Sequence, residues 1–125
     1  MIDLHINREG LDHNIQKARE NNIIIPTFAQ MEHPETIPEK IRGKLKNVGL
    51  WDVNPLNLFR ITWKNEAKEF GGLFQPVPNY IELPPELTGV PCRIIAMVGK
   101  WFPTGCHKVG ASFGCLAPRL VTGQF

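Results

Sequence analysis

A nearly continuous apolar run near the carboxyl end limits the folds that this chain can adopt. Residues 92–99 read CRIIAMVG; the turn KWFPTG follows, and a helical segment comes after the turn. Apolar runs of strand length are typical of strands covered on both faces, as in a parallel sheet. A strand, a glycine-containing turn and a helix in this order predict an α/β fold that presents a helix amino terminus to an anion.

Two helices are expected before this unit, within residues 1–50. Asn7 is a candidate N-cap for a surface helix with one narrow apolar stripe. Thr36 and Glu39 fit the capping box of a second helix, and Gly49 is its expected stop. Both segments are interpreted as helices that pack on a core.

Short strands and a last helix are expected after residue 50. Phe59, Ile61 and Trp63 alternate as in a half-buried strand, and NYIEL at residues 79–83 predicts another strand. Pro118 is expected to kink or end the last helix. The buried face of that helix is predicted to comprise Cys106, Val109, Phe113, Leu116 and Leu120.

Composition limits the partners that the chain is expected to bind and the cellular compartment in which it is expected to lie. A net charge of +2 without a run of basic residues argues against nucleic acid. No apolar run reaches the roughly 20 residues that cross a bilayer, so no membrane partner is expected. The amino terminus shows no secretory signal, and the three cysteines lack the spacing of a disulfide framework. These features predict a cytoplasmic protein.

The candidate reactive side chains lie at the start of the last helix. With Thr104 as N-cap, His107 would lie in the first turn and Lys108 just behind it. Cations at this end are unfavourable by about 0.3–1 kcal/mol each, so the pair is either tolerated on the surface or faces something negative. Lys108 offers a primary amine that can form a Schiff base with an aldehyde cofactor. The spacing of these residues alone also fits an interpretation of Lys108 as a solvated lysine on the helix surface.

The segment FPTGCHKVGASFG, residues 102–114, resembles the lysine segment of the fold-type II pyridoxal-phosphate enzymes. This group includes the tryptophan synthase β-subunit, cysteine synthase and the serine/threonine dehydratases. The histidine makes the segment most similar to the tryptophan synthase β-type version. Upstream, NPLNLFRI is similar to the group's Thr-Pro-Leu-x-x-hydrophobic-Arg segment. The residues that match the lysine segment are Pro103, Thr104, Gly105, His107 and Lys108.

The resemblance implies a fold, a cofactor and a reaction. Residues 51–125 would be the truncated start of a pyridoxal-phosphate-binding catalytic domain of three layers, and residues 1–50 a helical amino-terminal segment. Lys108 would form the Schiff base, and His107 would lie near the cofactor phosphate. The parent enzyme, commonly a homodimer in this group, would carry out β-elimination or β-replacement on an amino-acid substrate. The phosphate cup and the partner of the pyridine nitrogen cannot be placed here, so the fragment alone is expected to be inactive.

Two departures from the group's pattern leave the substrate subclass open. No carboxylate precedes the proline in VGKWF, and Cys106 stands where a small residue such as alanine is usual.

Three other interpretations remain open. Cys92, Cys106, His107 and Cys115 are candidate metal ligands, although they lack the close pairing of zinc sites. Cys106 activated by His107 would suit a hydrolase, but adjacent helical residues point about 100° apart. In the third interpretation, the chain is a non-catalytic α/β interaction module, or a decayed fragment with an exposed sheet edge. The cysteines are expected to be small buried hydrophobes, and His5, His13 and His33 to be solvated.

Overall fold

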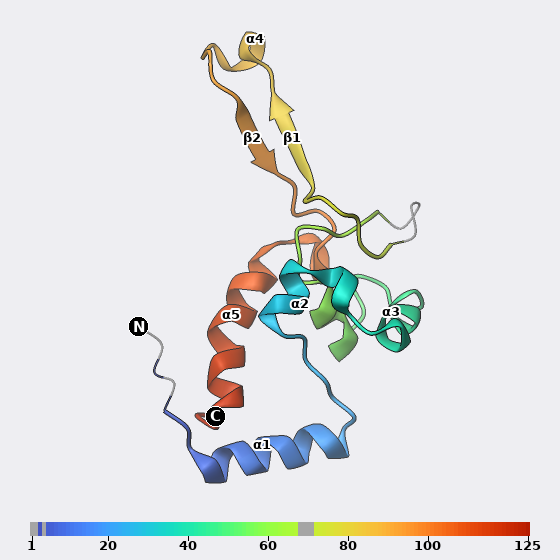
Figure 1. The fold of residues 1–125 in the computed structure, drawn as a ribbon, viewed down its shortest axis with the longest axis vertical. Helices are drawn as coiled ribbons and strands as arrows, with labels where there is room; N and C mark the ends of the chain where they lie inside the picture. The colour runs from blue at the N-terminus through green and yellow to red at the C-terminus, as the bar shows by residue number, and fades with distance from the viewer. Residues whose placement is uncertain (1–2, 4, 68–71) are drawn as a thin grey trace.

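The computed structural model describes Asp3, residues 5–67 and residues 72–125. Within these ranges, helices and one two-stranded sheet confirm a mixed α and β protein (Figure 1). The helices are α1 (Arg8–Glu20), α2 (Phe28–Glu32), α3 (Glu39–Leu45), α4 (Pro85–Thr88) and α5 (Lys108–Val121). The strands are β1 (Tyr80–Leu83) and β2 (Ile94–Met97), and the 3-10 helices are Pro34–Thr36, Pro55–Arg60 and Pro103–Gly105.

The apolar run at residues 92–99 forms one strand of an antiparallel hairpin. Tyr80 pairs with Met97 and Leu83 with Ile94, and the hairpin projects from the helical body (Figure 1). The expected strand at residues 79–83 is thus confirmed. The expected strand of a parallel sheet, covered on both faces, is wrong: Ile95 and Met97 are 44% and 45% exposed. Only residues 84–93 separate the two strands, whereas a parallel crossover needs about a dozen residues or more.

A bidentate ion pair crosses the hairpin. Arg93 Nε lies 2.7 Å from Glu82 Oε1, and Arg93 Nη2 lies 2.9 Å from Glu82 Oε2. The hydrogen bond from Arg93 lowers the pKa of Glu82 below its ordinary value of 4.5. Because the folded carboxyl has the lower pKa, the pair stabilises the hairpin above about that pH. The stabilisation is lost as the pH falls through the lowered value.

We expect the Glu82 carboxyl to titrate below 4.5 in the intact chain and at a higher pH in Arg93→Gln. Nuclear magnetic resonance of the side-chain carboxyl carbon measures both midpoints. Equal midpoints in the two proteins would contradict the pairing. Since both side chains are exposed, the global stability should change little.

The core consists of two apolar clusters, and the segment that follows Asn54 contributes side chains to both. One contains Ile61, Phe102, Phe113 and Ala117; the other contains Ile37, Leu45 and Phe59. The strand expected at residues 59–63 is wrong, because residues 55–60 form a 3-10 helix. Asn54 caps this helix by accepting a hydrogen bond from the Leu56 amide at 2.9 Å, and Pro55 fits its first turn.

The helix capping differs from the expectation at α3. Thr36 does not cap it: the residue ends a 3-10 turn, and its hydroxyl donates to the His33 carbonyl at 2.6 Å. The helix begins at Glu39 without a side-chain cap and ends at Leu45, before Gly49. A complete capping box is found instead at Thr27 and Gln30, where α2 begins. The sequence TFAQ carries this signal, and the expectation of two helices within residues 1–50 did not include it.

Helix α1 is attached to the rest of the molecule near the end of α5. Asn7 is its N-cap as expected, accepting from the Gly10 amide at 3.2 Å. The Asn7 amide in turn donates to the Thr122 carbonyl at 2.8 Å, and the Asn14 amide group donates to the Leu120 carbonyl at 3.0 Å. Figure 1 shows the carboxyl terminus beside the start of α1. No residue of α1 is buried, so these hydrogen bonds hold a helix that packs little.

Substitutions of two glycines should change stability in opposite directions. Gly123 has φ +73°, and a Cβ there would collide with the Asn7 carbonyl and the Leu11 amide. We expect Gly123→Ala to lose about 1–3 kcal/mol and to release α1. In Gly114→Ala, the new Cβ would meet nothing within 4 Å, so helix propensity should add up to about 1 kcal/mol. Urea unfolding measures both, and equal midpoints for the two variants would refute the attachment described here.

Candidate functional site

Lys108 is the first residue of α5, at the end of the strand, turn and helix unit that the sequence predicted. Its side chain is exposed. Its backbone carbonyl accepts from the Ser112 hydroxyl at 3.3 Å. The lysine is therefore presented at a helix amino terminus, as expected.

The turn before Lys108 differs from the expected N-cap arrangement. Thr104 is not the N-cap, because it adopts a left-handed conformation with φ +63° inside the turn Pro103–Gly105. Its amide donates to the Leu50 carbonyl at 2.9 Å. Gly105 follows with φ +67°, and two consecutive left-handed residues delay the helix until Lys108. A β-branched residue in this region is strained, and such strain concentrates at functional sites.

His107 is the N-cap residue of α5, but its side chain makes no capping hydrogen bond. Its ring stacks instead on Trp63, with ring centroids 5.5 Å apart and planes inclined by 28°. Trp63 also makes an edge contact with Phe102 at 5.0 Å. Gly99 gives the histidine room, since a Cβ there would lie 2.9 Å from the His107 Cβ. No local pattern in the sequence points to Trp63 or Gly99, because their roles depend on residues far apart in the chain.

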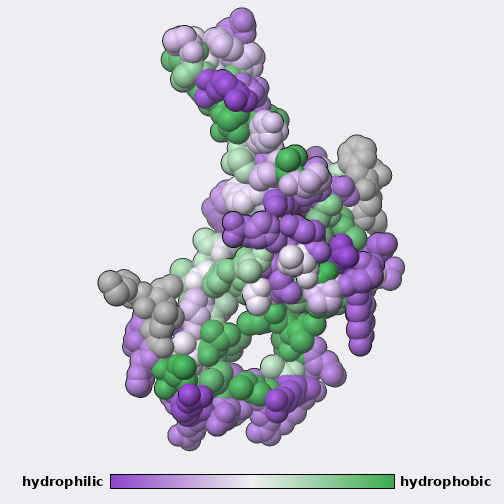
Figure 2. All heavy atoms as spheres, viewed as in Figure 1, coloured by the Kyte–Doolittle hydropathy of each residue, from purple (hydrophilic) through white to green (hydrophobic). Residues whose placement is uncertain are grey.

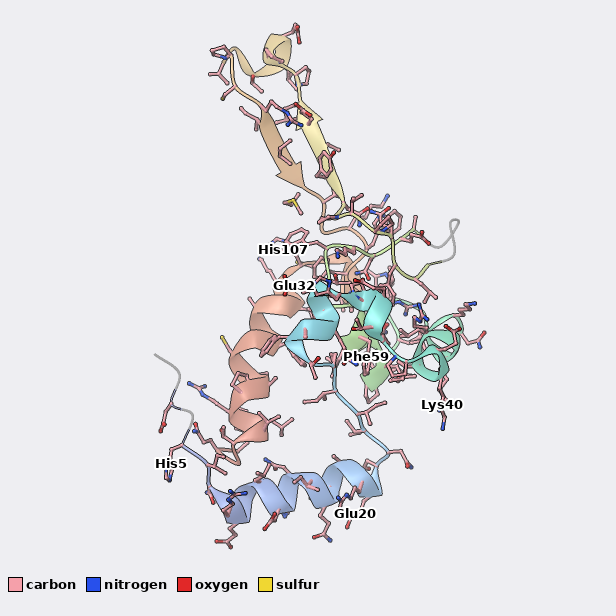
Figure 3. The ribbon with its side chains drawn as sticks, in the orientation of Figure 1. His5, Glu20, Glu32, Lys40, Phe59 and His107 are labelled. Atoms are coloured by element: carbon pink, nitrogen blue, oxygen red, sulfur yellow. The ribbon has the colours of Figure 1, made fainter. Side chains whose placement is uncertain are left out.

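A pocket of about 550 Å³ adjoins the stacked rings. Its apolar wall includes Ile61 and Phe102, and Gly110 forms part of the same lining. His107 and Glu32, both labelled in Figure 3, come from α5's start and from α2 to line it. Lys108 is not one of the lining residues, so the pocket and the amine face different surroundings.

The residues that the structure describes do not form a complete pyridoxal-phosphate site. The lysine and the helix amino terminus are present, but the exposed Lys108 side chain lies outside the neighbouring pocket. No buried polar atom without a hydrogen-bond partner in the described chain belongs to residues 99–114; those atoms are in Arg42, Arg60 and Asn65. Holding the cofactor against water needs a phosphate cradle and a ring partner. The described residues therefore supply the lysine but neither the phosphate cradle nor the ring partner that would enclose the cofactor.

The glycines and small residues of α5 behave differently from one another. A Cβ on Gly110 would come within 3.3 Å of Ile61 Cγ2, so this glycine permits close packing of α5 on the core. Beyond Gly110, the predicted buried face is only partly right. Phe113 is buried as expected, whereas Leu116 and Leu120 are 51% and 38% exposed. Pro118 lies inside α5, which continues to Val121.

The cysteines and the remaining histidines lie on the surface. Cys92 and Cys115 are exposed and Cys106 is half-buried, so the expectation that they are buried hydrophobes is wrong. His5, His13 and His33 are exposed as expected. Among Asp3, residues 5–67 and residues 72–125, no three His, Cys, Asp or Glu side chains are grouped so as to hold a metal ion.

Comparisons with known proteins add no assignment. No protein-family model, curated protein or solved structure matches this chain. Across the described residues, no helix is both long and apolar enough to span a bilayer.

Proposed function

We propose that this chain is the amino-terminal part of a pyridoxal-phosphate-dependent enzyme in which Lys108 forms the Schiff base. The observation that carries the proposal is the position of the lysine. Lys108 begins α5 shortly after the Pro-Thr-Gly turn, with Cys106 and His107 between them, and that turn follows strand β2. This is the order in which the fold-type II enzymes present their lysine. The strained Thr104 within the turn is a second feature typical of a functional segment.

The proposed reaction class comes from the resemblance in sequence. The parent enzyme would act on an amino acid by β-elimination or β-replacement, as a lyase or synthase similar to the tryptophan synthase β-subunit. His107 would lie on the side of the cofactor phosphate. Because the described residues do not enclose the amine, the remaining parts of the site would come from elsewhere in the longer protein or from a second subunit. The chain alone is therefore proposed to be inactive.

Reductive labelling of the complete gene product tests the proposal. The protein is incubated with pyridoxal phosphate, reduced with borohydride and mapped by peptide mass spectrometry. We expect the label at Lys108 and its loss in Lys108→Ala. Lys100→Ala is the matched control, because this lysine lies in the preceding turn, with Nζ 4.7 Å from the Trp101 ring centroid.

Two results would refute the enzyme proposal. One is a label spread evenly over the lysines of the complete gene product. The other is an equal extent of labelling in Lys108→Ala and Lys100→Ala. In the 125-residue chain by itself, we expect no preference for Lys108 over Lys100, since the amine is exposed there.

An apolar groove on α5 favours a second candidate, a non-catalytic interaction module. The groove has a volume of about 390 Å³ and is lined by side chains such as Val109, Leu116, Leu120 and Phe125. Apolar surface of this kind marks a place where another chain or segment packs. If the chain is only such a module, Lys108→Ala will behave as the parent in every assay. Sizing chromatography will then detect an association that Leu116→Asp disrupts.

A further inference from the structure

A second groove, distinct from the surroundings of Lys108, lies between α1 and α3. It has a volume of about 790 Å³, and residues 21–24 and the start of the 3-10 helix Pro55–Arg60 complete it. Figure 2 shows apolar surface around the opening that separates α1 from the rest of the molecule. Its apolar lining comprises Ile15, Ala18, Ile23, Ile24, Ile41 and Leu56, besides two prolines.

The apolar lining of this groove is accessible to water. Ile15, Ile23 and Ile24 are 38%, 38% and 49% exposed. Contiguous exposed apolar surface in a concave setting is typical of sites that bind another molecule. The groove therefore lacks an apolar partner within the described chain.

The charged residues of the groove are all cations. Arg19, Lys40 and Lys44 line it, and no Asp or Glu does. Lys40 projects from α3 toward the side on which α1 lies (Figure 3). Within the described part of the chain, none of the three forms an ion pair.

The neighbouring carboxylates are engaged elsewhere. Glu20 accepts from Gln16 Nε2 at 2.8 Å, and Glu39 pairs with Arg42 at 2.8 Å. Neither lines the groove. The positive rim therefore remains available to carboxylates of another molecule.

We propose that this groove docks an amphipathic helical segment of another polypeptide. Apolar side chains on one face of the segment would contact Ile24 and Ile41, and its flanking carboxylates would face Arg19, Lys40 and Lys44. An apolar groove selects an apolar helix face, and charge complementarity sets its orientation and excludes cationic segments. The groove is concave between α1 and α3, a shape that admits a helix face but not a flat bilayer surface. Lys108 is not in the lining, so this proposal is independent of the proposed enzyme function.

Fluorescence anisotropy with a synthetic peptide tests the proposal on the full chain. The probe is a labelled peptide of about 15 residues, long enough to be helical, with a leucine face flanked by glutamates. Two comparison peptides carry lysine in place of glutamate, or the same residues in scrambled order. We expect binding of the acidic amphipathic peptide alone, with an affinity that falls as salt rises.

Paired variants locate the binding to the groove. Lys40→Glu combined with Lys44→Glu should weaken binding about tenfold. The control pair, Arg8→Glu and Lys17→Glu, changes the net charge equally at exposed residues of α1 outside the groove and should leave affinity unchanged. Ile24→Asp should also weaken binding about tenfold. Val53→Asp is its control, since Val53 is fully exposed and outside the groove.

Several outcomes would overturn the proposal. These are equal binding of the acidic and basic peptides, equal affinities for the groove and control variants, or binding only to phosphatidylserine-containing vesicles. Self-association that Ile24→Asp abolishes, without peptide binding, would assign the groove to a second copy of the chain instead. Peptide binding that persists in Lys108→Ala would separate this site from the enzyme proposal.

Discussion

Arg60→Ala is expected to lose about 3 kcal/mol or more of the free energy of unfolding. The side chain is only 4% exposed, and its guanidinium joins the 3-10 helix Pro55–Arg60 to the residues at the end of α3. Nη1 donates to the Val48 carbonyl at 2.6 Å and to Asn57 Oδ1 at 2.8 Å, and Nη2 donates to the Leu45 carbonyl at 2.7 Å. Burial lowers the pKa of Arg60 from its ordinary value, and the Asp52 carboxylate partly opposes that effect.

The loss is large because two of these acceptors, the Val48 carbonyl and Asn57 Oδ1, have no other donor in the described chain. Asn57 cannot compensate, since its own amide group donates to the Gly49 and Asp52 carbonyls at 2.8 and 3.0 Å. Removing the guanidinium would leave the Val48 carbonyl and Asn57 Oδ1 without this donor, whereas the Leu45 carbonyl keeps the Val48 amide at 3.0 Å. Each buried group left without a partner costs about 1–3 kcal/mol.

Urea unfolding followed by circular dichroism measures the Arg60 prediction. Arg42→Ala is the matched control, because Arg42 forms a partly exposed ion pair with Glu39 and should lose at most about 1 kcal/mol. Arg60→Lys should fall between the two, since one ammonium cannot reach all the acceptors of a fork. If Arg60→Ala and Arg42→Ala unfold at the same urea concentration, Arg60 does not join these segments as described.

Phe59→Ala is expected to lose about 3–5 kcal/mol. Phe59, labelled in Figure 3, is 2% exposed and is the largest buried side chain of the cluster with Ile37 and Leu45. The truncation would remove the apolar contact that joins the 3-10 helix Pro55–Arg60 to α3 and would leave a cavity. A loss of this size is a large fraction of the roughly 5–15 kcal/mol that stabilises a typical domain.

Phe28→Ala provides the comparison for Phe59→Ala. Phe28 is 57% exposed and touches the core through an edge contact with Phe113, with ring centroids 5.9 Å apart. An aromatic pair of this kind contributes about 0.5–1.5 kcal/mol. Thermal unfolding of both variants distinguishes the sites, and a comparable decrease in the two melting temperatures would refute the assignment of Phe59 to the core.

Local signals predicted those elements whose causes lie within a few residues. Asn7 caps α1 as expected, because an N-cap needs only the amides that follow it. The strand at residues 79–83 was found from its composition. The alternating apolar residues at 59–63 predict a strand wrongly, because they serve two different clusters, Phe59 in one and Ile61 in the other. Alternation alone cannot distinguish these cases.

The candidate site was predictable in its residues but not in its geometry. The lysine segment could be located from its motif, and α5 does begin at Lys108. The position of His107 depends on Trp63, some forty residues upstream, and on the room left by Gly99. No local pattern specifies a contact between two such distant rings. The late start of α5 likewise follows from left-handed conformations at Thr104 and Gly105, which the expected N-cap did not anticipate.

The amino-acid sequence by itself determined the placement of α1, the strand at residues 79–83 and the helix that carries Lys108, since caps, turns and short periodic runs act over neighbouring residues. Tertiary structure alone decided that β2 pairs with β1 outside the core, and that the Arg60 side chain is buried against the carbonyls that follow α3. It also decided which apolar faces stay exposed. The physical reason is that burial and pairing depend on which distant segments meet, and local periodicity carries no information about that meeting.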